Sequence, residues 1–199
     1  MFIASESLLA LIQSRRTCYQ FDSQVELKAD ALQLCLEAAR WAPNHKLTQP
    51  WRYWVLGPNT QSQLAEIYAD NRARKKASDE CNYDCLYQKA IAKFQRIPQV
   101  ILVGQVLNPD PVIQKEDYAA CACAIQNLQL MAWNLQIGVQ WSTGPILQDH
   151  RTHALLNSDP SQIELIGALY IGPISAQDQK NLNSNARRKP LEEIVTYLS

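Results

Sequence analysis

Hydrophobic residues recur at the spacing of an amphipathic α-helix at two places near the start of the chain. The patterns span residues 5–16 and 27–40, where apolar side chains return at positions i, i+3, i+4 and i+7. A third helix is expected to begin at Asn59 and Thr60, because side chains of these types cap helix N-termini. Residues 70–93 are polar and charged, and the basic run at 72–76 within them indicates a solvated helix face or a mobile cover.

Four shorter runs predict β-strands. Residues 51–56, 139–141 and 165–171 are rich in aromatic and β-branched side chains. Residues 100–106 form a continuous apolar run, which is typical of a strand covered on both faces of its sheet.

A long helix is expected from about Lys115 to Ile137, with Gly138 as its terminating residue. Small or apolar residues lie on nearly all of its sides, which indicates a helix buried at the centre of the fold. Asp149 is expected to cap a short helix. This order of helices and strands predicts one layered domain over residues 1–199, of the α+β or the α/β class.

The overall charge excludes some classes of partner. The 199 residues include 19 basic and 19 acidic side chains, so neither nucleic acid nor an anionic membrane surface is suggested. No apolar run approaches the roughly 20 residues that a membrane span needs. The first 16 residues lack the pattern of a secretory signal, and a cytoplasmic location is therefore expected.

The six cysteines do not form a recognisable metal or redox motif. Cys81 and Cys85 are spaced C-x3-C, and Cys121 and Cys123 are spaced C-x-C, neither of which is a zinc or thioredoxin spacing. Reduced, partly buried thiols are predicted.

Three polar segments are candidates for ligand binding. Residues 43–50 form a loop with a proline at each end, which can present hydrogen-bond donors to a flat ligand with polar edges. Arg15 and Arg16 offer the forked donors that bind a phosphate, although cations also favour the C-terminus of a helix. The turn at 142–145 either directs backbone N–H groups at a ligand or is an ordinary turn.

Motifs for other chemistries are missing from the sequence. The six glycines form neither a G-x-G-x-x-G fingerprint nor a P-loop, and no G-x-S-x-G elbow occurs. The three histidines do not pair with a cysteine or serine nucleophile. These absences favour a bound cofactor that brings its own reactivity.

The motifs taken together resemble the nitroreductase family of FMN-dependent oxidoreductases, in its compact single-domain form. The matching segments are R-R-T-x-x-x-F at 15–21, A-P-N-H-K-x-x-Q-P-W at 42–51, P-x-V-I-L-V at 98–103, the small-residue helix from Tyr118, W-S-T-G at 141–144 and R-R-K-P-L at 187–191. The resemblance implies an α+β fold with a mostly antiparallel central sheet flanked by helices. It also implies a homodimer with one FMN in each of two interface sites, and a C-terminal tail of about residues 186–199 that wraps the partner subunit.

The resemblance also implies roles for individual residues. The FMN phosphate, ribityl chain and pyrimidine end would be held by Arg15, Arg16 and Thr17, with Arg187 or Arg188 completing the phosphate site. Trp41 and His45 would reach the flavin from the partner subunit, with Asn44 and Gln49 nearby. The isoalloxazine near N5 would be lined by Trp141, Ser142 and Thr143, largely through their backbone. Met131 would lie on the nicotinamide or substrate side.

Three positions depart from the family pattern. Tyr19 stands where many relatives have Arg or Lys to stabilise the negative charge of reduced flavin, and Arg16 is the candidate for the compensating cation. Ser142 replaces a common arginine, and His45 replaces a small hydroxyl residue. His45 either modulates the flavin with pH or is a neutral spacer.

The activity implied by the resemblance is ping-pong reduction. NADH or NADPH would reduce FMN, and a nitroaromatic, quinone or activated alkene would then reoxidise it, without an amino-acid nucleophile. Two alternatives share part of this pattern. One is a flavin-binding or sensory protein with little turnover, and the other is a flavin-independent thiol enzyme that uses Cys121 or Cys123.

Overall fold

The structure of the protein is a computed structural model that describes residues 3–22, 24–182 and 187–198. Its elements in chain order are α1 (Ser5–Ser14), α2 (Ala29–Arg40), η1 (His45–Leu47), β1 (Trp51–Val55), α3 (Pro58–Arg74), α4 (Glu80–Phe94), β2 (Gln99–Val106), α5 (Pro111–Asn134), β3 (Ile137–Ser142), η2 (Pro145–Leu147), α6 (His150–Leu155), β4 (Ile163–Pro173), α7 (Ala176–Leu182) and η3 (Leu191–Glu193).

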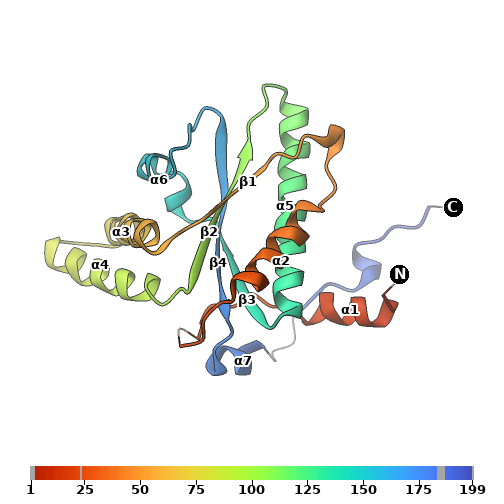
Figure 1. Ribbon diagram of the computed structural model, residues 1–199, viewed down its shortest axis with the longest axis horizontal. Coiled ribbons are helices and arrows are strands. Elements are labelled where there is room, and N and C mark those ends of the chain that lie inside the picture. The colour runs from red at the N-terminus through yellow and green to blue at the C-terminus, as the bar shows by residue number, and fades with distance from the viewer. Residues whose placement is uncertain (1–2, 23, 183–186, 199) are drawn as a thin grey trace.

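The four strands form one antiparallel sheet in the order β1-β2-β4-β3. In Figure 1 the sheet is seen nearly edge-on, with α3, α4 and α6 on one side and α2 and α5 on the other. This three-layer arrangement confirms the α+β class and the antiparallel central sheet. All four expected strands are present, and the expectation that 100–106 is covered on both faces is confirmed.

The alternation of side chains along β2 shows how the two cores form. Ile101 and Val103 pack in the core on the α5 side, whereas Val100 and Leu102 pack in the core on the α3 side. All four are fully buried. A strand buried on both faces can be apolar at every position, which is why this run is continuous in the sequence.

The polar region of the chain is more regular than the sequence predicted. The third helix begins at Pro58, with Gly57 rather than Asn59 as the cap, because proline suits the first turn of a helix. Residues 80–94 form a further helix, α4, whose N-terminus is capped by Asp79 accepting a hydrogen bond from Asn82 N. This helix was not among the elements that the sequence predicted.

Helix α5 begins earlier than expected, at Pro111, where the Asp110 carboxylate accepts a hydrogen bond from Val112 N. It ends at Asn134, and the left-handed residue that terminates it is Gln136, with φ 60°. The assignment of Gly138 as the terminator was wrong, since Gly138 lies inside β3. One side of α5 is buried against α2 and the sheet, whereas Ala119 and Cys123 are exposed, so the helix is central but not enclosed.

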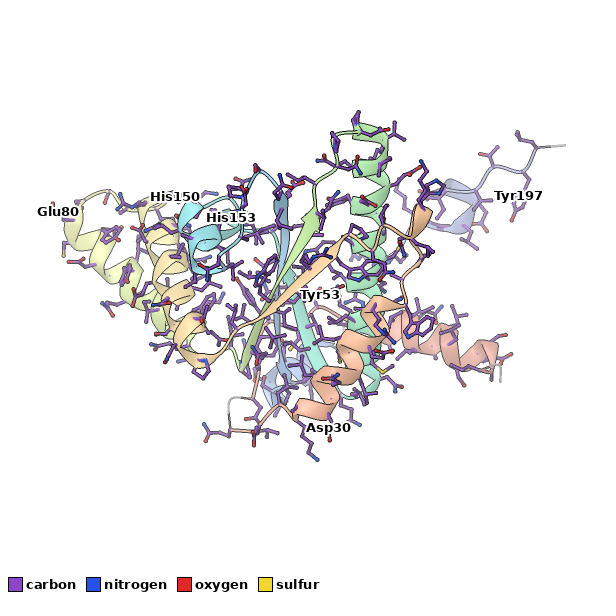
Figure 2. All side chains as sticks on the ribbon, turned by 45° about the horizontal axis from the view of Figure 1, so that its top comes forward. Asp30, Tyr53, Glu80, His150, His153 and Tyr197 are labelled. Carbon is purple, nitrogen blue, oxygen red and sulfur yellow. The ribbon has the colours of Figure 1, made fainter. Side chains whose placement is uncertain are left out.

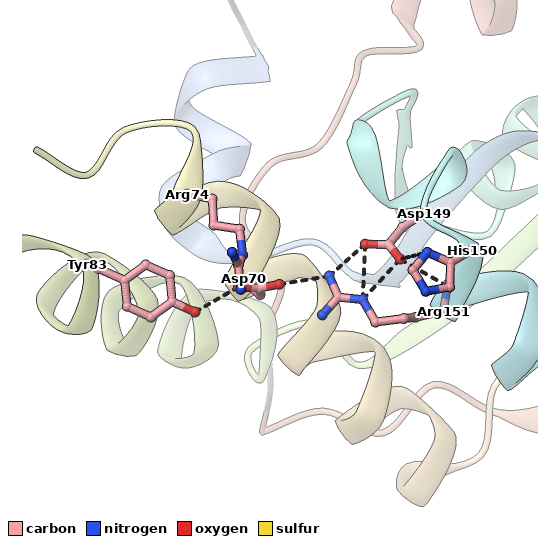
Figure 3. A network of polar contacts seen from close by, with 6 residues as sticks. All are labelled: Asp70, Arg74, Tyr83, Asp149, His150 and Arg151. Carbon is pink, nitrogen blue, oxygen red and sulfur yellow. Dashed lines mark hydrogen bonds and ion pairs between the residues drawn. The ribbon is translucent and has the colours of Figure 1, made fainter. Parts of the chain in front are cut away.

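A polar network fastens α3, α4 and α6 to one another (Figure 3). Asp70 on α3 accepts hydrogen bonds from Arg74 at 2.6 Å and from Tyr83 on α4 at 2.8 Å, and it pairs with Arg151 on α6 at 2.8 Å. Burial opposes ionisation of Asp70, but these donors outweigh it and lower the pKa of its carboxyl. Asp149 pairs with Arg151 at 2.7 Å, and this contact also lowers the pKa of the Asp149 carboxyl.

Candidate functional site

The segment that follows α1 is fixed against the edge of the sheet. Cys18 N donates to Val139 O of β3 at 3.1 Å, and Phe21 forms a bridge with Ile174. The buried Asp178 carboxylate accepts hydrogen bonds from the backbone of Tyr19 at 2.7 Å and Gln20 at 3.2 Å. Backbone groups of this segment are thus held in place.

Gly138 allows this close approach. A Cβ at position 138 would lie 2.5 Å from the Cys18 side chain, so no larger residue fits there without movement. Burial raises the pKa of the Cys18 thiol to about 12, and its contacts with Asp178 act in the same direction. This thiol is therefore a packing group and not a nucleophile.

Three guanidinium groups influence one another electrostatically near the C-terminal end of α1. Arg15 Nη1 donates to Gln129 Oε1 on α5 at 3.3 Å. Burial lowers the pKa of Arg15, and the neighbouring positive charges of Arg16 and Arg188 lower it further. Since Arg188 comes from the other end of the chain, helix-dipole preference does not account for the group. Clustered guanidinium forks fit a dianionic phosphate, whose binding would relieve their mutual repulsion.

The two C-terminal arginines differ in this respect. Arg188 is the one whose charge acts on Arg15, and its Nη1 donates to Arg187 O at 2.9 Å. The side chains of both arginines are exposed, so the charge acting on Arg15 is what distinguishes them. The structure therefore favours Arg188 for the phosphate group.

A cavity of about 670 Å³ lies beside the fixed segment, on the side of the sheet covered by α3 and α4. It is lined by Tyr19, Gln20 and Phe21, by Ser142 and Gly144 after β3, and by residues of both helices. The volume is within the roughly 300–1,000 Å³ of small-molecule sites. The cavity is thus large enough for a ring system.

Aromatic side chains form the inner wall of this cavity. Phe94 and Tyr170 are 1% and 5% exposed, with ring centroids 5.6 Å apart, and Tyr68 lies 5.0 Å from Phe94. Burial raises the pKa of the Tyr170 hydroxyl, although the proximity of Ser142 acts in the opposite direction. Apolar walls with a few polar groups suit a flat aromatic ligand.

The three residues expected at the isoalloxazine lie in different surroundings. Ser142 lines the cavity. Trp141 packs over Gly167 of β4 and donates from Nε1 to Ile166 O at 3.2 Å, while Thr143 lines a separate hollow near α6. Within the described residues of one subunit, Ser142 is therefore the member of the three that joins Tyr19 in the cavity wall.

The loop after α2 is constrained and lies apart from this cavity. Lys46, Leu47 and Gln49 all have left-handed backbone angles, with φ between 45° and 55°. Thr48 Oγ1 donates to Asp117 Oδ1 on α5 at 2.6 Å, and Gln49 N donates to Asn44 Oδ1 at 2.9 Å. The loop is thus held in a strained conformation.

The side chains expected to act across the interface are on this loop. Trp41 is 73% exposed, with its Nε1 donating to Glu37, and His45 is also exposed. None of Trp41, Asn44, His45 and Gln49 lines the cavity of its own subunit. In Figure 1 the loop connects α2 to β1. It lies beside the upper end of α5, whereas α7 lies below the lower end of that helix.

The remaining residues proposed from the sequence are Thr17, Met131 and the cysteine pair at 121 and 123. Thr17 is half-buried, and Met131 packs against the core on the α5 side. Cys121 is fully buried, and burial raises the pKa of its thiol to about 12, with Asp117 adding to the effect, so it is not a nucleophile. Among the described residues, no cluster of metal-ligating side chains occurs and no helix is long and apolar enough to cross a membrane.

Two groups of residues at the site were not identified from the sequence. Asp178 and Gln129 hold the site segments from elements distant in the chain, and no local pattern indicates them. Five cations of α3 and α4 line the cavity, although the basic run 72–76 was interpreted as a solvated face: Arg72, Lys75, Lys76, Lys93 and Arg96.

Comparison with known proteins identifies the family. The model of the nitroreductase family matches residues 12–173, which include the fixed segment, the loop and most of the cavity wall. This chain belongs to the nitroreductase family. Enzymes of this family are flavin oxidoreductases. YfhC of Bacillus subtilis (strain 168), which carries the name of an NAD(P)H nitroreductase, is 33% identical over 144 residues, covering 72% of each chain.

Solved structures share the nitroreductase fold. The nitroreductase-like family protein from Bacillus cereus has a TM-score of 0.81 at 23% identity, covering 100% of this chain and 99% of that one. The FMN-dependent nitroreductase NfnB from Mycobacterium smegmatis, in complex with NADPH, has a TM-score of 0.76 at 17% identity, covering 99% and 100%. The expected nitroreductase-like fold is confirmed.

Proposed function

We propose that this nitroreductase-family protein is an FMN-dependent NAD(P)H oxidoreductase that reduces nitroaromatics, quinones or activated alkenes. The observation that carries the proposal is the ring-sized cavity lined by Tyr19, Gln20 and Phe21, which follow Arg15 and Arg16 in the chain, and the charge of Arg188 acts on Arg15 as well. The fit is good because the arginines match a phosphate and the aromatic wall matches a flat ring.

The residues of the chain bind and orient the cofactor in this proposal. Arg15, Arg16 and Arg188 hold the phosphate, and Thr17 lies on the path from them to Tyr19. Ser142 and the Gly144 backbone face the ring. FMN held by these residues would supply the redox chemistry, in which electrons from NADH or NADPH are passed to the acceptor in a ping-pong sequence.

The protein supplies no nucleophile in this scheme. The buried thiols of Cys18 and Cys121 stay protonated at neutral pH because their pKa values are about 12. Water supplies the protons that the acceptor needs.

We also propose that residues 1–199 form one domain and that two copies form a homodimer with shared flavin sites. Helix α1 has no buried residue, although Leu8, Leu9 and Ile12 are apolar. An amphipathic helix whose apolar face is uncovered in the single chain favours association with a partner. We propose a second copy of the chain as this partner, because the strained loop also presents exposed side chains to the outside. Trp41 and His45 project from that loop and so would reach the partner's flavin.

The C-terminal segment supports the same assembly. Figure 2 shows Tyr197 on the opposite side of the molecule from Glu80 of α4, at the end of a segment that extends from the body. Tyr197 is 90% exposed, and Leu191, Ile194 and Leu198 are exposed as well. We propose that this tail wraps the partner; residues 186 and 199 of it lie outside the described ranges.

The enzymatic proposal is tested by following the flavin through one cycle. Protein loaded with FMN should lose its yellow colour when NADH or NADPH is added without oxygen, and a nitroaromatic should restore it repeatedly. Loss of colour without recovery would indicate a flavin-binding protein with little turnover. Activity that persists after Cys121→Ala and Cys123→Ala would exclude the thiol enzyme.

The assembly is tested by mixing two defective variants. Arg15→Ala lacks a phosphate ligand, and a Trp41→Ala/His45→Ala variant lacks the loop groups. If sites are shared, mixed dimers contain one site with both defects and one with neither, so mixing should restore FMN binding. A protein that sediments as a monomer while holding FMN would contradict the shared site.

A further inference from the structure

The cavity wall contains an uneven distribution of charge. Arg72, Lys75 and Lys76 at the end of α3, with Lys93 and Arg96 at the end of α4, all line it, and none of its other lining residues is a carboxylate. The sequence as a whole has equal numbers of basic and acidic residues, so this excess is local. The side chains of all five are exposed, which places them around the entrance and not on the inner wall.

Within the part of the chain that the structure describes, these five cations make no ion pair. Arg74, between them on α3, pairs instead with Asp70 in the polar network (Figure 3). Lys75 and Lys76 follow Arg72 by three and four residues at the end of α3, a spacing at which like charges repel each other. Helix stability therefore does not explain them, although the helix dipole favours a cation at each helix end.

The cations lie next to the aromatic wall. Arg72 Nη1 donates to the Tyr68 hydroxyl at 3.4 Å, and its guanidinium lies 5.9 Å from the Tyr68 ring centroid. The charge of Arg72 also acts to lower the pKa of Tyr170. A ring inside this cavity would therefore have positive charge at the entrance beside it.

We infer that the α3–α4 cations form an anion subsite that selects aromatic acceptors carrying a carboxylate or sulfonate. The inference rests on the proposed function, because the acceptor must enter the flavin cavity. Unpaired cations at the entrance of a cavity with low-dielectric walls concentrate anionic ligands and raise their association rates. The exposed side chains remain hydrated, so each contributes modestly and salt weakens the effect.

Binding is tested on the FMN-loaded protein with two unreactive ligands of the same shape. Benzoate and benzamide are titrated while the flavin absorption band is followed. The wild type should bind benzoate more tightly than benzamide. The Lys75→Gln/Lys76→Gln variant should raise the Kd of benzoate by roughly three- to tenfold, and Lys93→Gln should raise it in the same direction. Added NaCl should reduce the preference in the wild type.

Lys89→Gln is the matched control. Lys89 lies one turn before Lys93 on the same helix and is exposed, but it does not line the cavity. Its loss should leave the preference for benzoate unchanged. An equal loss of preference in Lys89→Gln would mean that benzoate responds to the overall charge of the protein and not to cations at a particular site. That result would overturn the proposed subsite.

Turnover separates the acceptor from the electron donor, which is also an anion. The ratio of kcat/KM for 4-nitrobenzoate to that for 4-nitrobenzamide should fall in Lys75→Gln/Lys76→Gln. In rapid-mixing experiments, the variant should show a lower rate constant for reoxidation of the reduced flavin by 4-nitrobenzoate. A loss confined to reduction by NADPH would assign the cations to the donor phosphate and overturn the inference.

The failure of the inference and of the proposed function are distinguishable. A wild-type protein that takes up FMN and reduces 4-nitrobenzamide, but treats the charged and neutral ligands equally, overturns the anion subsite alone. A protein that takes up no FMN overturns the proposed function itself.

Discussion

The phosphate site makes the sharpest prediction, because the two C-terminal arginines provide a variant and its control. The charge of Arg188 acts on Arg15, whereas that of the neighbouring Arg187, which is equally exposed, is not among the causes of the lowered pKa of Arg15. We expect Arg188→Ala to weaken FMN binding and Arg187→Ala to leave it nearly unchanged. Arg15→Ala should weaken binding as Arg188→Ala does.

The size of the effect follows from the contact that is lost. A hydrogen bond to a charged group contributes about 1.5–3 kcal/mol. Since a tenfold change in Kd corresponds to about 1.4 kcal/mol, each variant should raise the Kd for FMN by about 10- to 150-fold. The folded protein without flavin should lose little stability, because the Arg15 to Gln129 hydrogen bond is long, at 3.3 Å, and removing one like charge relieves repulsion.

The assay is equilibrium titration of apoprotein with FMN and, separately, with riboflavin, which lacks the phosphate. The wild type should prefer FMN, and Arg15→Ala and Arg188→Ala should lose most of this preference while their affinity for riboflavin changes little. Thermal unfolding of each apoprotein checks that the variants are folded. Equal loss of FMN and riboflavin binding, or undiminished FMN binding in a folded variant, would refute the phosphate assignment.

Three further predictions concern stability and the thiols. Gly167→Ala should lower the free energy of unfolding, measured in urea, by about 1–3 kcal/mol, because the new Cβ would lie 2.4 Å from Trp141 Nε1. Gly57→Ala is the control and should lower it less, because nothing lies within 4 Å of a Cβ at that position. Equal losses in the two variants would contradict the packing argument. The lowered pKa values of Asp70 and Asp149 mean that unfolded chains bind protons first, so the free energy of unfolding should fall as pH drops below about 4. That fall should be shallower in Asp149→Asn, and identical pH profiles would argue against the network. A thiol reagent should modify three of the six cysteines in the folded protein, the exposed Cys81, Cys85 and Cys123. Faster reaction of the buried cysteines would be inconsistent with the structure.

The sequence predicted the strands better than the polar helices. Residues 100–106 were identified because burial on both faces requires an apolar residue at nearly every position. Helix α4 was missed because it buries only Ala90 and Phe94 as it crosses the outside of the molecule, so its hydrophobic pattern is weak. The end of α5 was misplaced because Gly138 is required for the approach of Cys18, not for a helix cap.

Part of the site could be predicted only by resemblance to a family. Arg15 and Arg16 alone favoured a helix end over a phosphate site, and the phosphate assignment depends on Arg188, which is distant in sequence but whose charge acts on Arg15. Arg72 and Lys75 looked like a solvated surface because the sequence does not show which side of α3 faces the cavity. The flavin contacts of Trp141, Thr143, Met131 and the loop residues remain predictions.

Flavin uptake by the purified protein tests the central claim most directly. The protein is incubated with FMN, separated from free flavin by gel filtration, and examined by visible absorption against its protein content. Arginines at the start of a segment that goes on to line a ring-sized cavity predict a yellow protein with one flavin per subunit, bleached by NADH or NADPH. A colourless protein that retains no flavin after this treatment would contradict the account.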